Sequence, residues 1–334
     1  MRKLRKHRAH FAFVAASLAC LLGSGHAIAA GDDAISDDGE GLGTFAELSN
    51  AGLPFPGARE VSTSQLSLEG ANVGELSADE LEQLLSLPAV VSPVEEGFLK
   101  PTEEEDGQEV ILDLDTRTRN YTLDYPARAV VLIGFEAGRC SGFLISSDTV
   151  ATAGHCVHPG DGGSFFARDS YEIFPGFDGS TAPYGSCRAA RLFTVVGWAD
   201  NADERFDYGA IKLDCTVGNT VGWFGFRTNA PNNAPAIVTG YPGDKPLEQW
   251  QASDKVRRTA SRQIFYTADT LNGNSGGPVW EDWWHQDESR GPYAIAVHAY
   301  GTHGNDNHAI YNHGTRIVSA VFRNFVAWIE TPSS

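Results

Sequence analysis

Three short segments of the chain carry the side chains that nucleophilic catalysis requires. His155 lies in the segment TAGHC, Asp207 in DYGAIKL and Ser275 in GNSGGPV. A serine hydroxyl is a weak nucleophile, so it needs a base beside it, and the base needs a carboxylate that orients it. The glycines around Ser275 allow the N–H groups of Gly273 and Ser275 to hold an oxyanion, at about 3 kcal/mol per donor. These residue types predict acyl transfer with Ser275 as the nucleophile, His155 as the general base and Asp207 as the orienting acid.

Each segment alone is weak evidence, and it is the order of the three that favours catalysis. An isolated histidine is more often structural, Asp203 and Asp214 are alternative carboxylates, and glycine-rich turns are common. Residues 273–277 also fit the Gly-x-Ser-x-Gly pattern of an α/β-hydrolase esterase. That fold places its histidine last in the chain and alternates strands with helices, and this sequence does neither.

The N-terminus predicts export. Five basic residues at positions 2–8 precede an apolar or small-residue run from Phe11 to Gly23, and alanines follow at 27 and 29. This is the pattern of a secretory signal peptide over residues 1–29, and the run is too short to span a bilayer. We therefore expect a secreted, extracellular protein with no membrane contact after signal removal. Four cysteines then remain, an even number that suits two disulfides better than a zinc site: Cys140, Cys156, Cys187 and Cys215.

The distribution of charge predicts a second boundary. Residues 31–109 hold 19 acidic residues against two basic ones, within a chain of formal net charge −18. In this stretch Ser77 and Glu80 have the spacing of a helix capping box, and leucines follow at 81, 84, 85 and 87. The stretch is either a partly disordered solvating tail or a propeptide that keeps a protease inactive, and we favour a propeptide over residues 30–109. The absence of a basic patch argues against nucleic acid as a partner.

Residues 110–334 have the texture of an all-β domain. Short apolar runs at 129–133, 142–145, 210–213, 236–238 and 293–297 are separated by Gly, Asn, Asp and Pro and are predicted to be strands. Only the stretch from Ile317 to Ile329 has the apolar spacing of an amphipathic helix. About 225 residues of this kind fit a sandwich or barrel domain that ends in a helix.

The three segments resemble the signatures of the chymotrypsin-like serine proteases, and the match is closer to the bacterial glutamyl endopeptidases of that superfamily. Residues 115–119, 125–129, 218–222, 240–245 and 314–317 also resemble that subfamily. The resemblance covers residues 110 to the C-terminal helix. It implies two antiparallel six-stranded β-barrels with the active site between them, preceded by a signal peptide and a propeptide. It also implies protein and peptide substrates, with the propeptide as a further partner, and we expect a monomer without a cofactor.

The resemblance implies roles for individual residues. The triad roles given above follow from it, and Gly273 resembles the oxyanion-hole glycine. It further implies a disulfide between Cys140 and Cys156, beside the base. Cys187 and Cys215 match no disulfide expected in this subfamily, so their pairing is a hypothesis. A catalytically inactive binding module of the same fold would have lost a triad residue, and this chain has all three.

Two interpretations of the primary specificity (P1) pocket compete. Asp269 lies six residues before Ser275, where trypsin-like enzymes carry the acid that binds Lys or Arg. Thr270 and His298 resemble the residues with which glutamyl endopeptidases bind a P1 carboxylate, and those enzymes commonly carry an acid at the Asp269 position, turned away from substrate. A hydroxyl and an imidazole can donate to a carboxylate but do not suit a guanidinium. We favour Glu, then Asp, at P1, with Lys or Arg as the alternative and a structural role for His298 as a further one.

One region departs from the subfamily. Residues 281–292 are rich in tryptophan and charge, and three histidines follow, His303, His308 and His313. A histidine cluster can indicate a metal site, and Asp306 with Asn305 could suit calcium. Because the ligand spacing is irregular, we interpret this region as a solvated loop near the pocket that binds no metal, with structural calcium as the alternative.

Overall fold

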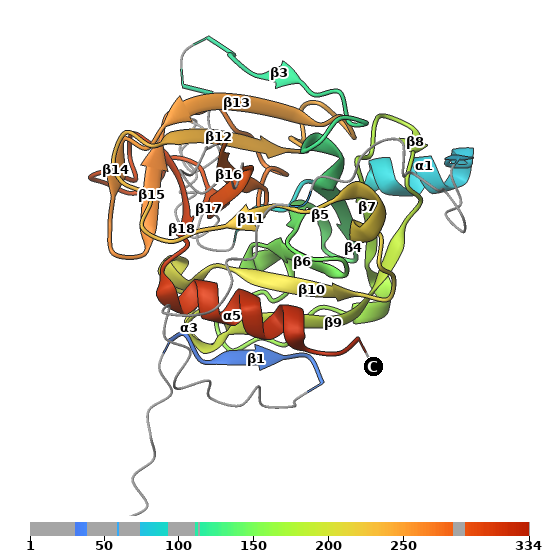
Figure 1. Cartoon of the computed structure of the whole chain (residues 1–334), viewed down its shortest axis with the longest axis horizontal. Helices are drawn as coiled ribbons and strands as arrows, with labels where there is room; N and C mark the ends of the chain where they lie inside the picture. Colours follow the sequence, from blue (N-terminus) through green and yellow to red (C-terminus); the bar gives the residue numbers. More distant parts are fainter. Residues whose placement is uncertain are drawn as a thin grey trace, which may run out of the picture.

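The computed structural model describes residues 31–38, 59, 74–92, 111–112, 114–282 and 291–333. Two β-sheets lie side by side, and the C-terminal helix α5 (Ser319–Glu330) runs along the first of them (Figure 1). The expected signal peptide lies outside the described residues, as does most of the expected propeptide. Among the described residues, no helix has the length and apolar character needed to cross a bilayer.

The first sheet closes into a six-stranded antiparallel barrel. Its strands are β4 (Val130–Phe135), β5 (Gly138–Leu144), β6 (Thr149–Thr152), β7 (Glu172–Pro175), β9 (Cys187–Val195) and β10 (Gly209–Leu213). Hydrogen bonding runs in the order β9-β10-β6-β5-β4-β7, and β7 pairs back onto β9 to close the barrel. The continuous apolar run predicted to be a strand at 129–133 becomes β4, which is buried along its whole length. A seventh strand, β1 (Ala34–Ser36), adds to β9 from outside the barrel.

The second sheet curls into a half-barrel. Its strands are β12 (Pro235–Gly240), β13 (Trp250–Lys255), β14 (Arg258–Thr259), β15 (Gln263–Tyr266), β16 (Pro278–Glu281), β17 (Tyr293–Tyr300) and β18 (Asn312–Arg316), with β3 (Thr118–Arg119) added to β13 and β11 (Gly225–Phe226) added to β17. The order β14-β15-β18-β17-β16-β12-β13 begins and ends with strands that are consecutive in the chain. This arrangement confirms the predicted all-β fold with a C-terminal helix.

Short elements join the strands. They are the helices α3 (Val196–Ala199) and α4 (Gly218–Val221), the strand β8 (Thr181–Ala182), and single 3₁₀ turns at Ala127–Ala129, Gly154–Cys156, Arg168–Ser170 and Glu204–Phe206. Helix α5 is fixed by its aromatic face, where the Trp328 ring stacks on Phe193 of β9 with ring centroids 5.6 Å apart. The loops are therefore attached to a rigid apolar framework. One 3₁₀ turn contains His155, and another directly precedes Asp207.

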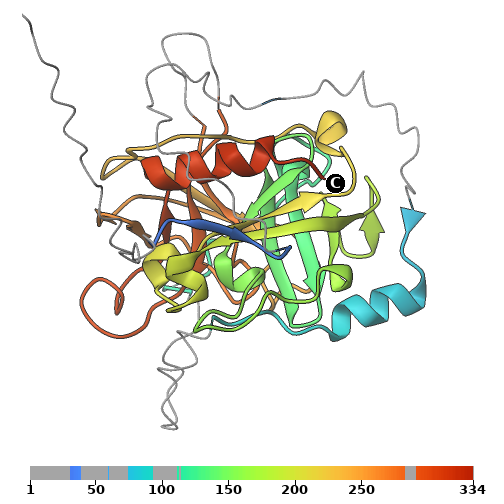
Figure 2. The ribbon, with the colours of Figure 1, turned by 90° about the horizontal axis from the view of Figure 1, so that it is seen from below.

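Parts of the acidic N-terminal stretch pack on the first barrel. Helix α1 (Ala78–Ser86) begins with the predicted capping box, because Ser77 Oγ accepts from Glu80 N and Glu80 Oε2 accepts from Ser77 N. Strand β2 (Gly74–Glu75) before it pairs with β8. The buried face of α1 presents Leu84 to Gly134 of β4, and Figure 2 shows α1 and β1 at separate places on the first barrel. The predicted helix is thus confirmed, and of its leucines Leu84 is buried whereas Leu85 is 46% exposed.

Candidate active site

Two disulfides lie in the first barrel, and one of them holds the candidate base. Cys140 on β5 is bonded to Cys156, with Cα atoms 6.2 Å apart, so the turn Gly154–Cys156 that carries His155 is fixed to the barrel wall. Cys187 on β9 is bonded to Cys215 after β10, with Cα atoms 5.9 Å apart. The implied first disulfide and the hypothetical second one are both confirmed.

Asp207 is the carboxylate that the fold brings to His155. It is fully buried, its Oδ1 accepts from the His155 backbone N–H at 2.9 Å, and its Oδ2 lies 2.7 Å from His155 Nδ1. An N–H on Nδ1 that donates to Asp207 leaves Nε2 to act as a base. The rivals are occupied elsewhere: Asp203 binds Arg205, and Asp214 accepts from the backbone N–H of Arg188. The sequence-based choice among three aspartates agrees with this geometry.

A third donor to Asp207 was not foreseen from the sequence. Tyr300 Oη donates to Asp207 Oδ2 at 2.5 Å, and Thr315 Oγ1 donates to the Asp207 backbone carbonyl at 2.8 Å. Burial, reinforced by the negative charge of Asp207, holds the pKa of Tyr300 well above its ordinary value, so the phenol stays protonated and can donate. Tyr300 also lies against the His155 ring, with centroids 6.2 Å apart. In the sequence it ends an apolar strand, a position typical of core packing.

Glycines are required in the loop that carries Ser275. Gly273 has φ +101°, and a Cβ there would lie 2.5 Å from a backbone carbonyl oxygen. Gly276 has φ +85°, and a Cβ there would overlap the hydroxyl of Thr152 and the carbonyl of Ser141. Both positions therefore exclude residues larger than glycine, which explains why the segment around Ser275 is rich in glycine.

Ser141 of β5 ties this loop to the first barrel. Its backbone N–H donates to the Ser275 carbonyl at 2.8 Å, and its Oγ donates to the Gly273 carbonyl at 2.7 Å. The Asn272 carbonyl accepts from Gly243 N at 2.7 Å, so the trans peptide that follows directs the Gly273 N–H to the opposite side. Because Ser141 adjoins disulfide-bonded Cys140, the serine loop and the His155 turn are anchored on the same strand.

The candidate P1 residues lie next to the serine loop. His298 on β17 is fully buried, and its backbone exchanges hydrogen bonds with that of the loop: Gly276 N donates to the His298 carbonyl, and His298 N donates to the Gly277 carbonyl. Burial lowers the pKa of His298 to about 3, with a smaller contribution from the nearby His155, so the ring is neutral. Thr270 is also fully buried, and its Oγ1 has no hydrogen-bond partner among the residues that the structure describes.

Tyr266 is a further residue of this pocket that the sequence analysis missed. Its hydroxyl lies 2.5 Å from His298 Nδ1, and both side chains are buried. A phenol that donates to Nδ1 fixes the neutral imidazole with its proton on Nε2. The segment QIFY, which forms β15, gave no sign of a functional residue in the sequence, because an apolar strand that ends in tyrosine is common.

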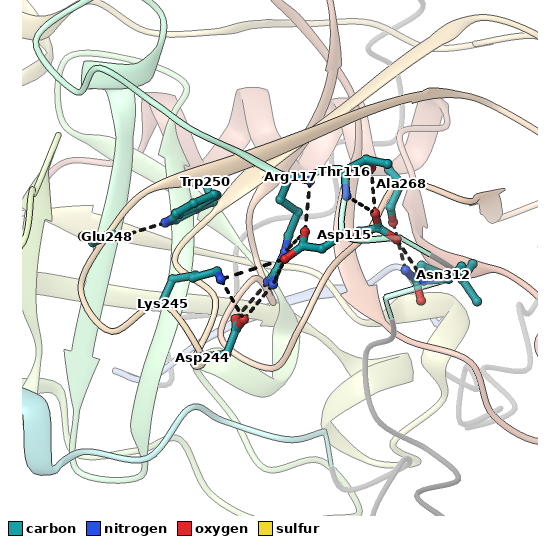
Figure 3. A network of polar contacts seen from close by, with 11 residues as sticks. Asp115, Thr116, Arg117, Asp244, Lys245, Glu248, Trp250, Ala268 and Asn312 are labelled. Atoms are coloured by element: carbon teal, nitrogen blue, oxygen red, sulfur yellow. Dashed lines mark hydrogen bonds and ion pairs between the residues drawn. The ribbon is translucent and has the colours of Figure 1, made fainter.

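Both carboxylate oxygens of Asp269 accept hydrogen bonds from residues near the start of the expected protease domain. Its Oδ1 accepts from the backbone N–H of Leu112 at 2.9 Å, and its Oδ2 accepts from Thr116 N at 2.9 Å and Thr116 Oγ1 at 2.6 Å. Next to it, Arg117 forms ion pairs with Asp115 at 2.9 Å and Asp244 at 2.6 Å (Figure 3). Both oxygens of Asp269 therefore hold Leu112 and Thr116 against the loop just before Thr270.

The N-terminal stretch also pairs with the edge of the candidate site. The carbonyls of Leu87 and Pro88 accept from Arg139, the first from its Nε at 2.8 Å and the second from its backbone N–H at 2.7 Å. The backbone N–H of Val90 donates back to the Arg139 carbonyl at 3.0 Å. This is a parallel bridge to the residue just before Cys140.

Beyond this bridge, residues 89–92 cross the site. Ala89 Cβ is 3.4 Å from the position that a Cβ on Gly273 would take, and 2.9 Å from that on Gly243. Ser92 is fully buried and hydrogen-bonds the hydroxyl of Tyr300. The segment therefore reaches from the serine loop to the partner of Asp207.

The histidine-rich region is only in part the solvated loop that we expected, since residues 304–306 are exposed. His303 and His313 are buried, and together with His308 they surround Glu204, a residue that the sequence analysis did not single out. This cluster was missed because Glu204 lies 99 residues before His303 in the chain. Trp280 is buried, whereas Trp283 and Trp284 lie outside the described residues.

Comparison with known proteins agrees with this geometry. The sequence family described as "Trypsin-like peptidase domain" matches residues 140–285. The glutamyl endopeptidase of Bacillus licheniformis is 39% identical over 222 residues, which cover 65% of this chain and 68% of that protein. The chain belongs to the glutamyl endopeptidase family of trypsin-like serine proteases. As a member of this family it is a serine endopeptidase, a hydrolase that acts on proteins and peptides.

Further relatives of this glutamyl endopeptidase family member are more distant. A Bacillus subtilis protein named extracellular metalloprotease is 37% identical over 229 residues, covering 65% of this chain and 69% of the relative. The glutamyl endopeptidase of Staphylococcus aureus strain MW2 is 28% identical over 195 residues, covering 56% and 58%. Among solved structures, a Glu endopeptidase in complex with MPD superposes with TM-score 0.57 at 28% identity, over 66% of this chain and all of that one.

Proposed function

We propose that this endopeptidase cleaves peptide bonds through an acyl-enzyme on Ser275, with His155 as the general base and Asp207 as the orienting acid. The observation that carries this proposal is the buried Asp207 carboxylate, which binds both the backbone N–H and Nδ1 of His155. This contact fixes the ring so that Nε2 receives the serine proton and later delivers it to the leaving amine. The N–H groups of Gly273 and Ser275 stabilise the oxyanion.

A serine-directed phosphonofluoridate tests the nucleophile. The wild type should be labelled at one site, and Ser275→Ala should not be labelled. Ser141→Ala is the matched control, because it removes a buried hydroxyl that supports the loop but is not the nucleophile. Labelling of Ser275→Ala at the wild-type rate would contradict the assignment.

The same site supports Glu, then Asp, as the preferred P1 residue. Three buried polar groups lie near the serine loop: the Thr270 hydroxyl, the His298 imidazole and the Tyr266 hydroxyl. The Tyr266 hydroxyl lies beside His298 Nδ1. With Tyr266 donating to Nδ1, His298 carries its proton on Nε2 and can donate it to a carboxylate. The Lys or Arg alternative requires a free acid, and both oxygens of Asp269 are already bonded to Leu112 and Thr116.

A P1 profile on a peptide library tests this preference. The wild type should cleave after Glu, and His298→Ala should lose kcat/KM for Glu by about 10- to 150-fold, since a buried hydrogen bond to a charged group contributes about 1.5–3 kcal/mol. Asp269→Asn is the informative control. If Asp269 does not bind the P1 side chain, neither the wild type nor Asp269→Asn should cleave after Lys or Arg. Cleavage of the library after Lys or Arg by the wild type would overturn the Glu assignment.

We further propose that the chain is exported by a signal peptide over residues 1–29 and kept inactive by a propeptide over residues 30–109. The supporting contacts are those of residues 87–92, which pair with Arg139 and bury Ser92 against Tyr300. A substrate has to displace these residues to reach the serine loop. A cut after Glu109 would release them and would match a preference for Glu.

N-terminal sequencing of the protein recovered from the medium tests both steps. It should give a mature protein that starts at residue 110, with activity that appears in step with the cut. Glu109→Gln should accumulate uncut and inactive, whereas Ser275→Ala should accumulate uncut but be processed when wild-type enzyme is added. Full activity of the uncut chain would refute the inhibitory role.

A further inference from the structure

Three histidines and one glutamate lie together on the acid side of the candidate triad. His308 Nε2 is 3.0 Å from Glu204 Oε1, and His313 Nε2 is 3.8 Å from Glu204 Oε2. One donor atom from each of these three residues lies within 4.8 Å of the other two. His303 Nε2 is also 3.0 Å from Glu204 Oε2.

These separations suit one small cation. Zinc binds histidine nitrogen and carboxylate oxygen at about 2.0–2.2 Å in a tetrahedron, in which neighbouring ligand atoms are about 3.3 Å apart. The two measured nitrogen–oxygen separations, 3.0 and 3.8 Å, lie on either side of this value. Imidazole and carboxylate together suit a divalent transition metal better than calcium, which prefers six to eight oxygen ligands.

The burial of His313 is a second, independent observation. Its side chain is fully buried, and neither ring nitrogen has a hydrogen-bond partner among the described residues. A buried polar group without a partner costs about 1–3 kcal/mol, so the position calls for a ligand.

The surroundings hold the ligands in place. Gln263 Nε2 lies 3.1 Å from Glu204 Oε1 and orients the carboxylate, as outer partners do around metal ligands. The rings of Phe265 and Tyr300 stack on His313, with centroids 5.3 and 5.0 Å away. The cluster therefore has oriented donors between aromatic walls.

We propose that Glu204, His308 and His313 bind one divalent transition metal ion of the zinc class, with His303 holding the carboxylate or completing the shell. The ion joins the turn Glu204–Phe206, which leads into Asp207, to the strand β18 that carries His313. Because Tyr300 stacks on His313 and donates to Asp207, the ion would brace the acid side of the triad without touching substrate.

Zinc titration of the purified chain tests the site, with Ser275→Ala as the background to prevent self-digestion. One Zn²⁺ should bind per chain by calorimetry and elemental analysis. At a hundredfold excess over Kd, the thermal unfolding midpoint should rise by about 5–10 °C. Co²⁺ at the same site should give the visible absorption of a tetrahedral nitrogen–oxygen complex.

Variants separate this site from adventitious binding. Glu204→Gln and His308→Gln should each weaken Zn²⁺ binding by at least a hundredfold, whereas Asp306→Asn, which removes a charge from the same loop and tolerates its positive φ of 58°, should bind as the parent does. If Glu204→Gln fails to fold, His308→Gln decides, since its side chain is 28% exposed. Absence of stoichiometric Zn²⁺ binding in the parent, or equal binding in all variants, would overturn the proposal.

Discussion

Removal of the Tyr300 hydroxyl deletes one contact of the candidate triad and, in the uncut chain, the hydrogen bond with Ser92. Tyr300→Phe keeps the ring, and hence its stacking on His313 and its contact with His155, but deletes the donor 2.5 Å from Asp207 Oδ2. The hydroxyl is fully buried, so no water can take its place without opening the core. The variant therefore leaves the carboxylate with the two donors of His155 alone.

The structure sets the expected magnitudes. A hydrogen bond to a charged group contributes about 1.5–3 kcal/mol, so the free energy of unfolding should fall by that amount. The loss in kcat should be smaller, about tenfold at most, because His155 remains bonded to Asp207 through its backbone N–H and Nδ1. Tyr300 is thus a positioning residue, and its deletion should not approach the effect of deleting a triad member.

Urea unfolding and steady-state kinetics measure the two quantities on the same protein. Tyr208→Phe is the matched control, since its buried hydroxyl also takes part in a hydrogen bond, accepting from Asn324 Nδ2 at 2.8 Å, but its ring packs against helix α5. Tyr208→Phe should lower the free energy of unfolding and leave kcat unchanged. Unaltered stability in Tyr300→Phe would refute the hydrogen bond, and a thousandfold loss of kcat would refute the positioning role.

Three other predictions concern the triad, the pocket and the second disulfide. Asp207→Asn should fold but lower kcat by about 10⁴, since the amide favours the wrong tautomer of the base; retained activity would exclude Asp207. The pKa of His298 is about 3 in the folded protein against 6.5 unfolded, so the unfolded chain binds more protons between these values. Stability should therefore fall by about 2 kcal/mol from pH 7 to pH 5, and a urea-unfolding comparison should show less of this fall in His298→Gln; equal slopes would contradict the lowered pKa. Replacement of Cys187 and Cys215 by serine should cost about 3–4 kcal/mol of unfolding free energy for a 28-residue separation, with kcat retained; a loss below about 1 kcal/mol would count against the bond.

The site residues that could be predicted are those whose identity is set by the local backbone conformation or by their neighbours in the sequence. Gly273 and Gly276 adopt positive φ values, so the backbone itself dictates the sequence around Ser275. His155 was recognisable from its small neighbours and the adjacent cysteine. Asp207 was preferable to Asp203 because it lies two residues before a buried strand, β10.

The parts that were not predictable depend on contacts between distant segments. Tyr266 and Tyr300 are ordinary strand residues until the fold places their hydroxyls beside His298 and Asp207. Glu204 looked like one more acidic residue in a turn. Its meeting with His303, His308 and His313 depends on how the first barrel and the half-barrel meet, which no local pattern encodes.

The same separation of local and distant information applies to the fold. Apolar runs predicted the strands β4, β10 and β17 closely, since each is buried along its length. Closure of the first barrel by β7 and β9 was not visible in the sequence, and neither was the addition of β1 to β9. Strand pairing is a non-local choice, and short alternating segments leave it open.

Strand β1 has a consequence for the timing of activation. It belongs to the portion that we propose is cut away, yet three of its residues pair with β9. In the intact chain its tether keeps β1 at a high effective concentration, which dilution does not change. After the cut, the same contact is an association between two molecules, so its occupancy follows total concentration. At equilibrium the cut leader therefore remains bound where the protein is concentrated and dissociates where it is dilute, which couples its loss to dilution in the surrounding medium.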